Sequence, residues 1–475
     1  MSIAHPTTRL SCYRSSRTLG EIELRKEPEI ERWSMVPPRP TQATVKFIDE
    51  YCETYRYLFP EVRTFEYFKY LHLGMISDIK RKTLPAIAKV VGLEDTEGLD
   101  HFLTKSPWSV EELRKRRLKL ILAAVNGEEI SVIIDETGDK KKGQTTDYVK
   151  KQYIGNLGKI ENGIVAVTAY GLLRGMTFPL MVEVYKPKER LKEGDIYKSK
   201  PQIGGEIIKK LKEIGFRIKL VLADSEYGES EENFVSVLHQ EKLNFVLAIR
   251  GNHGMWLPSG QTIRYNKWRE FERVFSTEKT ETRYIREIIF GKKREIRYWQ
   301  VTNNKETLPE NSTWCIMTRV PRIKYKEVGN LYGLRNWVEY GLKQSKNELG
   351  WADFRVTDYS RIEKWWEIVM SAYLMVSLQS EQLNEPREAT LSLAKTAEMK
   401  KHPGWNGGKG WKNILNNLRL FIQPLCSFNL LKPWLVVVFT PQIIRLFCRL
   451  FFQLNQSINS LLEKILPRNS YFSSA

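Results

Sequence analysis

The sequence predicts an α/β protein built around a mixed β-sheet with helices on its faces. After residue 127 the hydrophobic pattern changes from helical spacing to short apolar runs, and five such runs lie between residues 128 and 250. The first three follow one another directly, whereas stretches with helical spacing accompany the last two. Strands in succession, followed by an alternation of strand and helix, indicate a mixed sheet flanked by helices.

The chain begins with two regions of different character. Residues 1–42 are rich in Ser, Arg and Pro, and we predict a flexible leader there. From 43 to 127 the apolar residues recur with helical spacing, so we predict a helical domain. Ser109 and Glu112 have the spacing of a capping box, which places the start of the last helix of this domain at Ser109.

The helix that begins at Ser109 is strongly basic. Arg114, Arg116 and Arg117 follow in its second turn. One interpretation is a solvated basic face, and the other is contact with DNA phosphates. Both remain open at this point, and the three arginines are candidate DNA-binding residues of a candidate DNA-binding domain.

The five apolar runs define the first part of the core, residues 128–254. Val, Ile and Leu dominate these runs, as expected for strands that are covered on both faces. Between the third and fourth runs lies a stretch with helical spacing that ends at Gly215, a residue typical of helix termination. The runs are EEISVIIDE, GIVAVTAYGLL, TFPLMVEVY, RIKLVLAD and NFVLAIR.

The second half of the chain combines a β-rich segment with helices. Residues 255–325 contain strand-like runs such as TRYIREIIF and REIRYWQV, and we interpret them as an insertion rather than a continuation of the core. Helices in 326–382 complete the core, and 383–475 forms a helical region where two copies of the chain would associate. The apolar segment 430–452 is interrupted by charged residues and prolines, so we expect packed helices and no membrane span.

Composition favours a nucleic-acid partner. The chain of 475 residues has 75 Lys+Arg against 56 Asp+Glu, a net charge of +19, and it carries 13 Trp, 21 Tyr and 20 Phe. Phosphates attract cations and bases stack on flat rings, so basic and aromatic surface together fit DNA better than an anionic membrane.

The five cysteines show no CxxC spacing, which argues against a disulfide framework and a zinc ribbon and is consistent with a reducing cytoplasm.

Two aspartates end apolar runs of the predicted sheet. Asp135 follows SVII and Asp224 follows KLVLA. Either residue alone is more often a structural strand end than a catalyst, but neighbouring strands would bring the two carboxylates together, where like charges require a cation. Because the six histidines show no ligand spacing, carboxylates must hold any metal, and this favours Mg²⁺.

A third group of candidates lies on a predicted helix over residues 332–349. At about 100° per residue, Tyr332, Arg335, Glu339 and Lys346 fall within roughly 60° of one another. A polar stripe of this kind is normally a solvated face with salt bridges. Here the aromatic neighbours make a poor solvent face, and a glutamate between an arginine and a lysine suits a site for metal and phosphate.

These residues resemble the DDE superfamily of insertion-sequence transposases. The family signature Tyr-x2-Arg-x3-Glu-x6-Lys stands here without a gap, and the two aspartates match in DETGDKKKG and DSEYG. The resemblance covers most of residues 43 to about 440, and the longer interval between the second and third acids leaves room for the insertion. It implies a ribonuclease-H-like, five-stranded mixed sheet interrupted by a β insertion.

The resemblance also implies the chemistry and the partners. Asp135, Asp224 and Glu339 would hold two Mg²⁺ ions, which Mn²⁺ can replace, against a scissile phosphodiester. Tyr332, Arg335 and Lys346 would hold phosphates of double-stranded transposon ends, which a homodimer brings together before joining them to target DNA. Neighbouring carboxylates leave the choice of ligand open; these are Glu136, Asp139 and Glu226.

Two further points stay open. In relatives with a similar insertion an aromatic residue receives a flipped base, and Trp299 is either that residue or a core tryptophan. The competing functions are another ribonuclease-H-like nuclease, such as a junction resolvase, and a DNA-binding relative without catalysis. We expect the protein in the cytoplasm, associated with the nucleoid.

Overall fold

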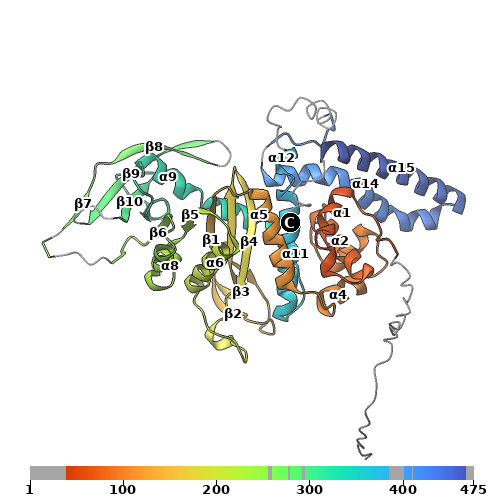
Figure 1. The fold of residues 1–475 in the computed structure, drawn as a ribbon, viewed down its shortest axis with the longest axis horizontal. Coiled ribbons are helices and arrows are strands. Elements are labelled where there is room, and N and C mark those ends of the chain that lie inside the picture. Colours follow the sequence, from red (N-terminus) through yellow and green to blue (C-terminus); the bar gives the residue numbers. More distant parts are fainter. Residues whose placement is uncertain are drawn as a thin grey trace, which may run out of the picture. The chain divides into compact units, whose positions relative to one another are not determined.

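The computed structural model describes residues 39–254, 259–260, 262–275, 279–290, 295–383, 401–408 and 410–466 (Figure 1). Residues Pro40–Ala475 form one compact unit, and the following description concerns the described part of that unit. The predicted leader therefore lies almost entirely outside the described residues. The turn FGKKRE also falls mostly outside them, because residues 291–294 are not described.

A five-stranded mixed sheet forms the core, as predicted. Its order is β4–β3–β1–β5–β6, where β1 runs antiparallel to β3 and parallel to β5, and β5 runs parallel to β6. A further strand, β2 (Lys150–Ile154), pairs with the start of β3. The five apolar runs became the five core strands: β1 (Ile130–Lys140), β3 (Lys159–Leu173), β4 (Met176–Val184), β5 (Ile218–Ala223) and β6 (Phe245–Ile249).

The β-rich insertion extends this sheet, which differs from our expectation of an element separate from the core. Its last strand pairs antiparallel with β6, with Cys315 opposite Ile249. The unpaired edge of β6 offers a row of backbone donors and acceptors, and the insertion satisfies them. The strands are β7 (Ile263–Tyr265), β8 (Arg269–Val274), β9 (Thr280–Phe290), β10 (Arg297–Thr302) and β11 (Trp314–Thr318).

Helices cover both faces of the sheet (Figure 1). α6 (Lys200–Ile214) packs on β3, and it begins at Ser199, whose side chain accepts from the Gln202 N–H. On the other face α11 (Tyr359–Ser377) packs against β4 and against α5 (Val110–Val125). The capping interaction predicted at Ser109 is present, since its hydroxyl accepts from the Glu112 N–H.

The N-terminal domain is helical, as predicted, and it packs on the core through α11 and its own last helix α5. Buried aromatic side chains fill its interior, among them Tyr51, Phe65 and Phe68. Its first four helices are α1 (Lys46–Glu53), α2 (Val62–Ile76), α3 (Leu84–Val91) and α4 (Glu97–Thr104). The short helical segments that follow β5 are α7 (Ser225–Gly228), a π-helical turn (Glu231–Val235) and α8 (Ser236–Gln240).

The helix predicted over 332–349 is broken in the structure. α9 (Tyr325–Gly333) ends before α10 (Asn336–Asn347) begins, so Tyr332 and Glu339 lie on different helices. The connecting residues form tight turns, in which the Arg335 N–H donates to the Tyr332 carbonyl and the Val338 N–H to that of Arg335. Gly333 is the last residue of α9, where its low helix propensity favours an interruption of the helix. The prediction of one continuous helix was wrong.

Two long helices form a hairpin in the C-terminal region after the short α12 (Ser380–Leu383). α14 (Trp411–Val438) packs its first half into the body, and the stacked rings of Phe428 and Phe451 join it to α15 (Pro441–Ile465). By length and composition α14 qualifies as a candidate membrane span among the described helices, with 22% of its most apolar stretch buried. The expectation of no membrane contact stays a prediction.

Candidate active site

Asp135 and Asp224 lie at the same edge of two adjacent parallel strands. Ile133 of β1 is in register with Leu222 of β5, so each aspartate follows two residues after a paired position. The sequence predicted that β1 ends at Asp135. The strand instead continues to Lys140 alongside β3. It is β5 that stops, at Ala223, so no residue of β5 pairs with Asp135, whose side chain is buried.

Gly228 explains how the chain turns after Asp224. The Asp224 carboxylate caps α7 by accepting from the Glu226 N–H at 2.9 Å. The helix then packs so closely on β6 that a Cβ at Gly228 would lie 1.9 Å from the Ala248 carbonyl oxygen. Only glycine permits this approach, which holds Asp224 beside β1. The DSEYG motif therefore combines a candidate ligand with the residue that positions it.

Glu339 reaches the same edge from α10. This helix contacts β1 and β3, and Gly341 lets it approach closely, since a Cβ there would lie 2.9 Å from the Tyr170 ring. Val338 and Leu342 face the core beside it. Glu339 itself is more than half exposed, with 56% of its side chain accessible. The carboxylate is thus presented to solvent from a helix that is firmly anchored.

Arg335 draws the three predicted acids together. Its Nη2 lies 3.5 Å from an Asp135 oxygen and 4.0 Å from an Asp224 oxygen, and its Nη1 lies 3.3 Å from Glu339. The guanidinium is largely buried, with 21% of the side chain exposed. Three carboxylates from β1, α10 and the end of β5 thus converge on one positive charge, as the spacing of the motif implied.

The carboxylates at this edge fit a divalent cation. Asp135, Glu136 and Asp224 each offer an oxygen, and these oxygens all lie within 4.8 Å of one another. One Glu136 oxygen is buried with no hydrogen-bond partner among the described residues, while the other lies 3.6 Å from Lys200. An all-oxygen donor set of this kind suits a hard cation such as Mg²⁺ or Mn²⁺. Glu339 lies outside this group of three and joins it through Arg335.

Burial and mutual repulsion perturb these carboxylates in the expected direction. Burial raises the pKa of Asp135 to about 7, against the attraction of Arg335 and with the help of the Asp224 and Glu339 charges. Burial also raises the pKa of Glu136 to about 8, against the attraction of Lys200. A cation among the oxygens would favour the charged forms and reverse both shifts.

The other carboxylates left open by the sequence are engaged elsewhere. Asp139 pairs with Lys346 at 3.4 Å, and Glu226 pairs with Lys200 at 3.0 Å. Glu136 is the one that joins the candidate metal site, and sequence reasoning left it undecided. Its position next to Asp135 was the available signal. Lys200, at the first turn of α6, carried no signal in the sequence.

Tyr332 lies beside Trp314, and Lys346 lies beside β1. The Tyr332 ring lies 6.2 Å from that of Trp314, and burial raises the pKa of its hydroxyl. The Lys346 ammonium donates to the Gly138 carbonyl at 2.8 Å, so it braces the part of β1 that follows Asp135. The described contacts of Lys346 are therefore to protein, and its role toward phosphate remains a prediction.

The arginines of α5 face the interior, which corrects their candidate role in DNA binding. Arg117 is fully buried and donates to Glu367 and to the Pro179 carbonyl. Arg114 pairs with Glu363 at 2.7 Å, and the Arg116 Nε donates to the Thr54 carbonyl at 2.8 Å. Glu363 and the buried Glu367 of α11 pair with Arg114, and Glu367 also pairs with Arg117. A solvated face does not describe these three arginines, and their side chains are already engaged by protein groups.

Trp299 is a core residue rather than a platform for a flipped base. It lies on β10 with 4% of its surface exposed, and Arg297 covers its ring at 4.7 Å. A base could reach the ring only after the surrounding side chains had moved. The alternative interpretation of Trp299, as part of the core, is the one that the structure supports.

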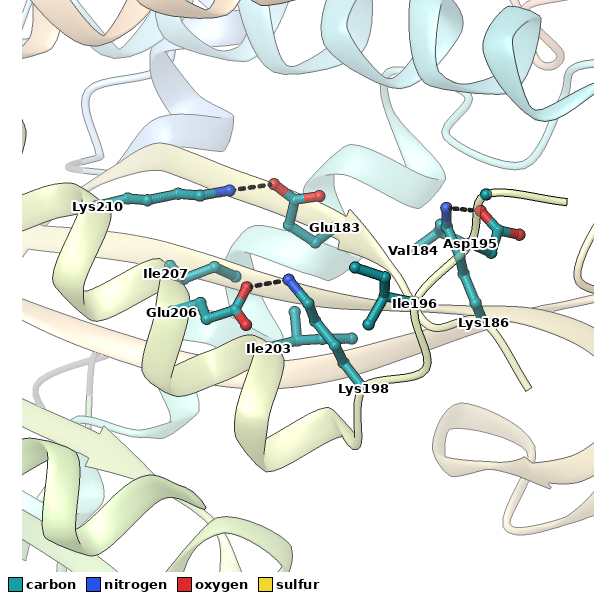
Figure 2. A pocket seen from close by; sticks show the side chains of 11 residues that line it. Glu183, Val184, Lys186, Asp195, Ile196, Lys198, Ile203, Glu206, Ile207 and Lys210 are labelled. Atoms are coloured by element: carbon teal, nitrogen blue, oxygen red, sulfur yellow. Dashed lines mark hydrogen bonds and ion pairs between the residues drawn. The ribbon is translucent and has the colours of Figure 1, made fainter. Parts of the chain in front are cut away.

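A cavity of about 270 Å³ lies between α6 and the loop after β4 (Figure 2), and none of the three acids lines it. Its lining is rich in lysine, which would attract phosphate if the charges were free. Each lysine in its wall is paired with an acid: Lys186 with Asp195, Lys198 with Glu206 and Lys210 with Glu183. The charges that line the cavity are therefore balanced by one another.

A family model and a sequence relative agree with this geometry. A family model described as DDE superfamily endonuclease matches residues 58–273. Over 329 residues the chain is 63% identical to the probable transposase for insertion sequence element IS701 from Microchaete diplosiphon, an alignment covering 69% of this chain and 87% of that protein. The solved synaptic complex of piggyBac transposase with hairpin DNA aligns with a TM-score of 0.41 at 11% identity, covering 89% of this chain and 84% of the other.

The mixed sheet, the carboxylates at its edge and the matching family define a DNA endonuclease that uses a divalent metal. With 63% identity over most of the relative, the chain belongs to the DDE family of insertion-sequence transposases that contains the IS701 protein. It is accordingly an enzyme that cleaves DNA and transfers strands.

Proposed function

We propose that the protein moves its insertion sequence by cut-and-paste transposition, binding double-stranded terminal inverted repeats and joining the cut ends to target DNA. The convergence of Asp135, Asp224 and Glu339 on Arg335 carries this proposal. Family membership supports strand transfer over a junction resolvase, and three intact acids argue against a relative without catalysis.

We further propose that the site takes two Mg²⁺ ions, which Mn²⁺ can replace. Asp135, Asp224 and Glu136 would hold one position, and Glu339 would complete the second. Bound metal would supply the activation of water or a 3′-hydroxyl and the neutralisation of charge on the leaving oxygen. The chain's own part is to position groups, since in-line attack on phosphorus depends mainly on orientation and charge.

Arg335 and Lys346 would serve the substrate in different ways. The Arg335 guanidinium is held by acids that a cation would neutralise, so on metal binding it becomes available to a DNA phosphate. Lys346 fixes the part of β1 after Asp135 through Gly138 and Asp139, which keeps the first acid in place. Tyr332 borders the same edge and would contact the strand next to the scissile phosphate.

A matched pair of glutamates on α10 and its C-terminus tests the assignment of the third acid. Glu339→Gln removes a ligand with little change of volume and should abolish cleavage while end-DNA affinity stays equal or rises. Glu348→Gln is the control, because Glu348 is paired with Lys412 at 2.5 Å and Arg419 at 2.9 Å. Cleavage of a labelled end and gel-shift affinity are measured on both variants. Near-normal cutting by Glu339→Gln would refute the proposed site.

We propose a homodimer that associates through the C-terminal hairpin of α14 and α15. Thirteen apolar side chains there are at least 39% exposed, including Trp434 at 67%, Val437 at 79% and Phe452 at 60%. At roughly 80 to 100 Å² each they expose about 1,000 Å², comparable with the ~800 Å² that each partner buries in a stable interface. A second copy of the same hairpin would cover this area symmetrically.

Light scattering coupled to gel filtration tests this interface. Val437→Asp with Leu446→Glu should convert a dimer into a monomer, because charges would be buried at the contact. Gln456→Glu, on the exposed surface of α15, is the control and should leave the dimer intact. A dimer that persists in the double variant, or a monomeric wild-type protein that binds lipid vesicles, would contradict the proposal.

A further inference from the structure

Two arginines of the insertion lie on one face of the sheet. β8 and β9 pair antiparallel, with Phe271 opposite Arg283 and Arg273 opposite Glu281. Arg273 and Arg283 are therefore diagonal neighbours on the same face of the two strands. Both guanidiniums lie over the ring of Trp314, at 5.7 and 4.7 Å from its centroid. Two cations thus share one aromatic surface.

The hydrogen-bonding capacity of this pair is only partly used. Arg283 donates through Nε to Glu281 at 2.9 Å, but its Nη1 is buried without a partner among the described residues, and only 9% of the side chain is exposed. Arg273 has no ion pair with a described carboxylate and is packed against Phe275 at 4.9 Å. Burial and the nearby charge of Arg283 lower the pKa of Arg273. Glu281 and Glu339 offset the burial and the repulsion at Arg273 only in part, and an anion would relieve that repulsion.

The pair adjoins the helices that carry the site signature. β8 packs on α9, and a Cβ at Gly333 would lie 3.5 Å from the Arg273 Nε. Trp314 in turn lies 6.2 Å from the ring of Tyr332. The Asn330 side chain also ties α9 to β8 by accepting from the Val274 N–H at 3.0 Å. A DNA strand that reached the three acids past Tyr332 would also pass Arg273 and Arg283.

We propose that Arg273 and Arg283, held by Trp314, bind a phosphodiester of the DNA strand beside the active site. The inference rests on the proposed function, since DNA is its ligand. A guanidinium fork can donate two parallel hydrogen bonds to a phosphate, and the Trp314 ring keeps both forks in place before DNA arrives. A preorganised arginine loses less side-chain entropy on binding than a free lysine. This contact lies outside the four-residue signature.

Arg273→Gln tests the site, with Lys305→Gln as the matched control. Both changes remove one positive charge from the insertion, and Lys305 is exposed against the Tyr284 ring. The probe is a labelled duplex of the terminal repeat that brackets the gene, titrated by fluorescence anisotropy at several salt concentrations in Ca²⁺. Arg273→Gln should weaken binding about 10-fold and lower the salt slope by about one, while Lys305→Gln leaves both nearly unchanged.

Further measurements separate this inference from the proposed function. Arg273→Lys should recover the salt slope but not the full affinity, because the charge returns without the planar fork. Mn²⁺ affinity, measured by calorimetry, should stay unchanged in Arg273→Gln, and this excludes damage to the acids. If the wild-type protein cuts the repeat but Arg273→Gln and Lys305→Gln bind alike, the phosphate site is refuted and the transposase remains. If the wild-type protein neither binds nor cuts the repeat, the proposed function fails as well.

Discussion

The protein contains two clusters in which arginine meets carboxylates, and they differ in their balance of charge. Between α5 and α11, Arg114 and Arg117 enclose Glu367, which is fully buried. At the edge of the sheet, a single arginine, Arg335, faces Asp135, Asp224 and Glu339. In the first, closed cluster the buried acid is paired with two arginines. In the second, open cluster three acids share one arginine, and the cluster faces solvent through Glu339.

The pKa shifts follow this difference. Burial alone would raise the pKa of Glu367, but Arg117 and Arg114 outweigh it and hold the pKa below its ordinary value. Burial raises the pKa of Asp135 to about 7, because one arginine shared among several acids does not offset it. The number of guanidiniums within 4.0 Å of the buried acid, two at Glu367 and one at Asp135, therefore distinguishes the structural ion-pair network from the candidate cation site.

The largest effect is expected where the closed cluster is opened. Arg117→Met keeps most of the side-chain volume but removes the main partner of Glu367 and the donor to the Pro179 carbonyl. A buried carboxylate left with one arginine should cost about 3 to 5 kcal/mol of unfolding free energy. Urea unfolding measures this cost. A variant that unfolds like wild type but binds end DNA more weakly would assign Arg117 to DNA binding. It would contradict the contrast drawn between the two clusters.

A smaller effect is expected in the open cluster, with the opposite sign and a dependence on pH. The folded-state pKa of Asp135, about 7, lies above the ordinary value of about 3.9 for an aspartate, so folding takes up a proton between these values. Stability from this group is full below about pH 4 and is lost as the pH rises through 7. In chelator, Asp135→Asn should match wild type near pH 4 and exceed it by about 2 to 4 kcal/mol above pH 7. Parallel stability curves would contradict the raised pKa.

The sequence predicted the sheet and the acids because both depend on local patterns. Runs of Val, Ile and Leu gave the five core strands, and the motif that contains Asp224 also contains Gly228, whose missing Cβ permits the close packing on β6. The helical arrangement of Arg335 and Glu339 is kept despite the break in the predicted helix, because both residues lie on the α10 side of the break.

What could not be predicted depends on contacts between distant residues. The basic pattern of α5 is the same whether it faces DNA or the buried Glu367, which lies 250 residues further along the chain. The sequence around Trp299 is likewise compatible with an exposed or a buried ring. The pairing of β10 with β9 and β11 decides between them. The pairing of β6 with β11 could not be predicted from either segment, because any free strand edge can accept a partner.

The smallest effect tests the competition between Arg335 and a cation in the open cluster. In the closed cluster, removing Arg117 leaves the buried Glu367 with Arg114 as its remaining arginine, whereas here the guanidinium lies near oxygens that a metal would use. Arg335→Gln removes one positive charge about 4 Å from these oxygens, which should strengthen Mn²⁺ binding by about 1 to 2 kcal/mol, or roughly 5- to 30-fold, without DNA. Affinity for end DNA should fall at the same time, because the phosphate partner is lost. Calorimetry with Mn²⁺ and a gel shift with end DNA measure the two effects, and Arg174→Gln, which removes a surface arginine paired with Glu128, is the control. Weaker Mn²⁺ binding in Arg335→Gln would mean that the arginine organises the acids instead of competing for them, and the two clusters would then differ in exposure but not in kind.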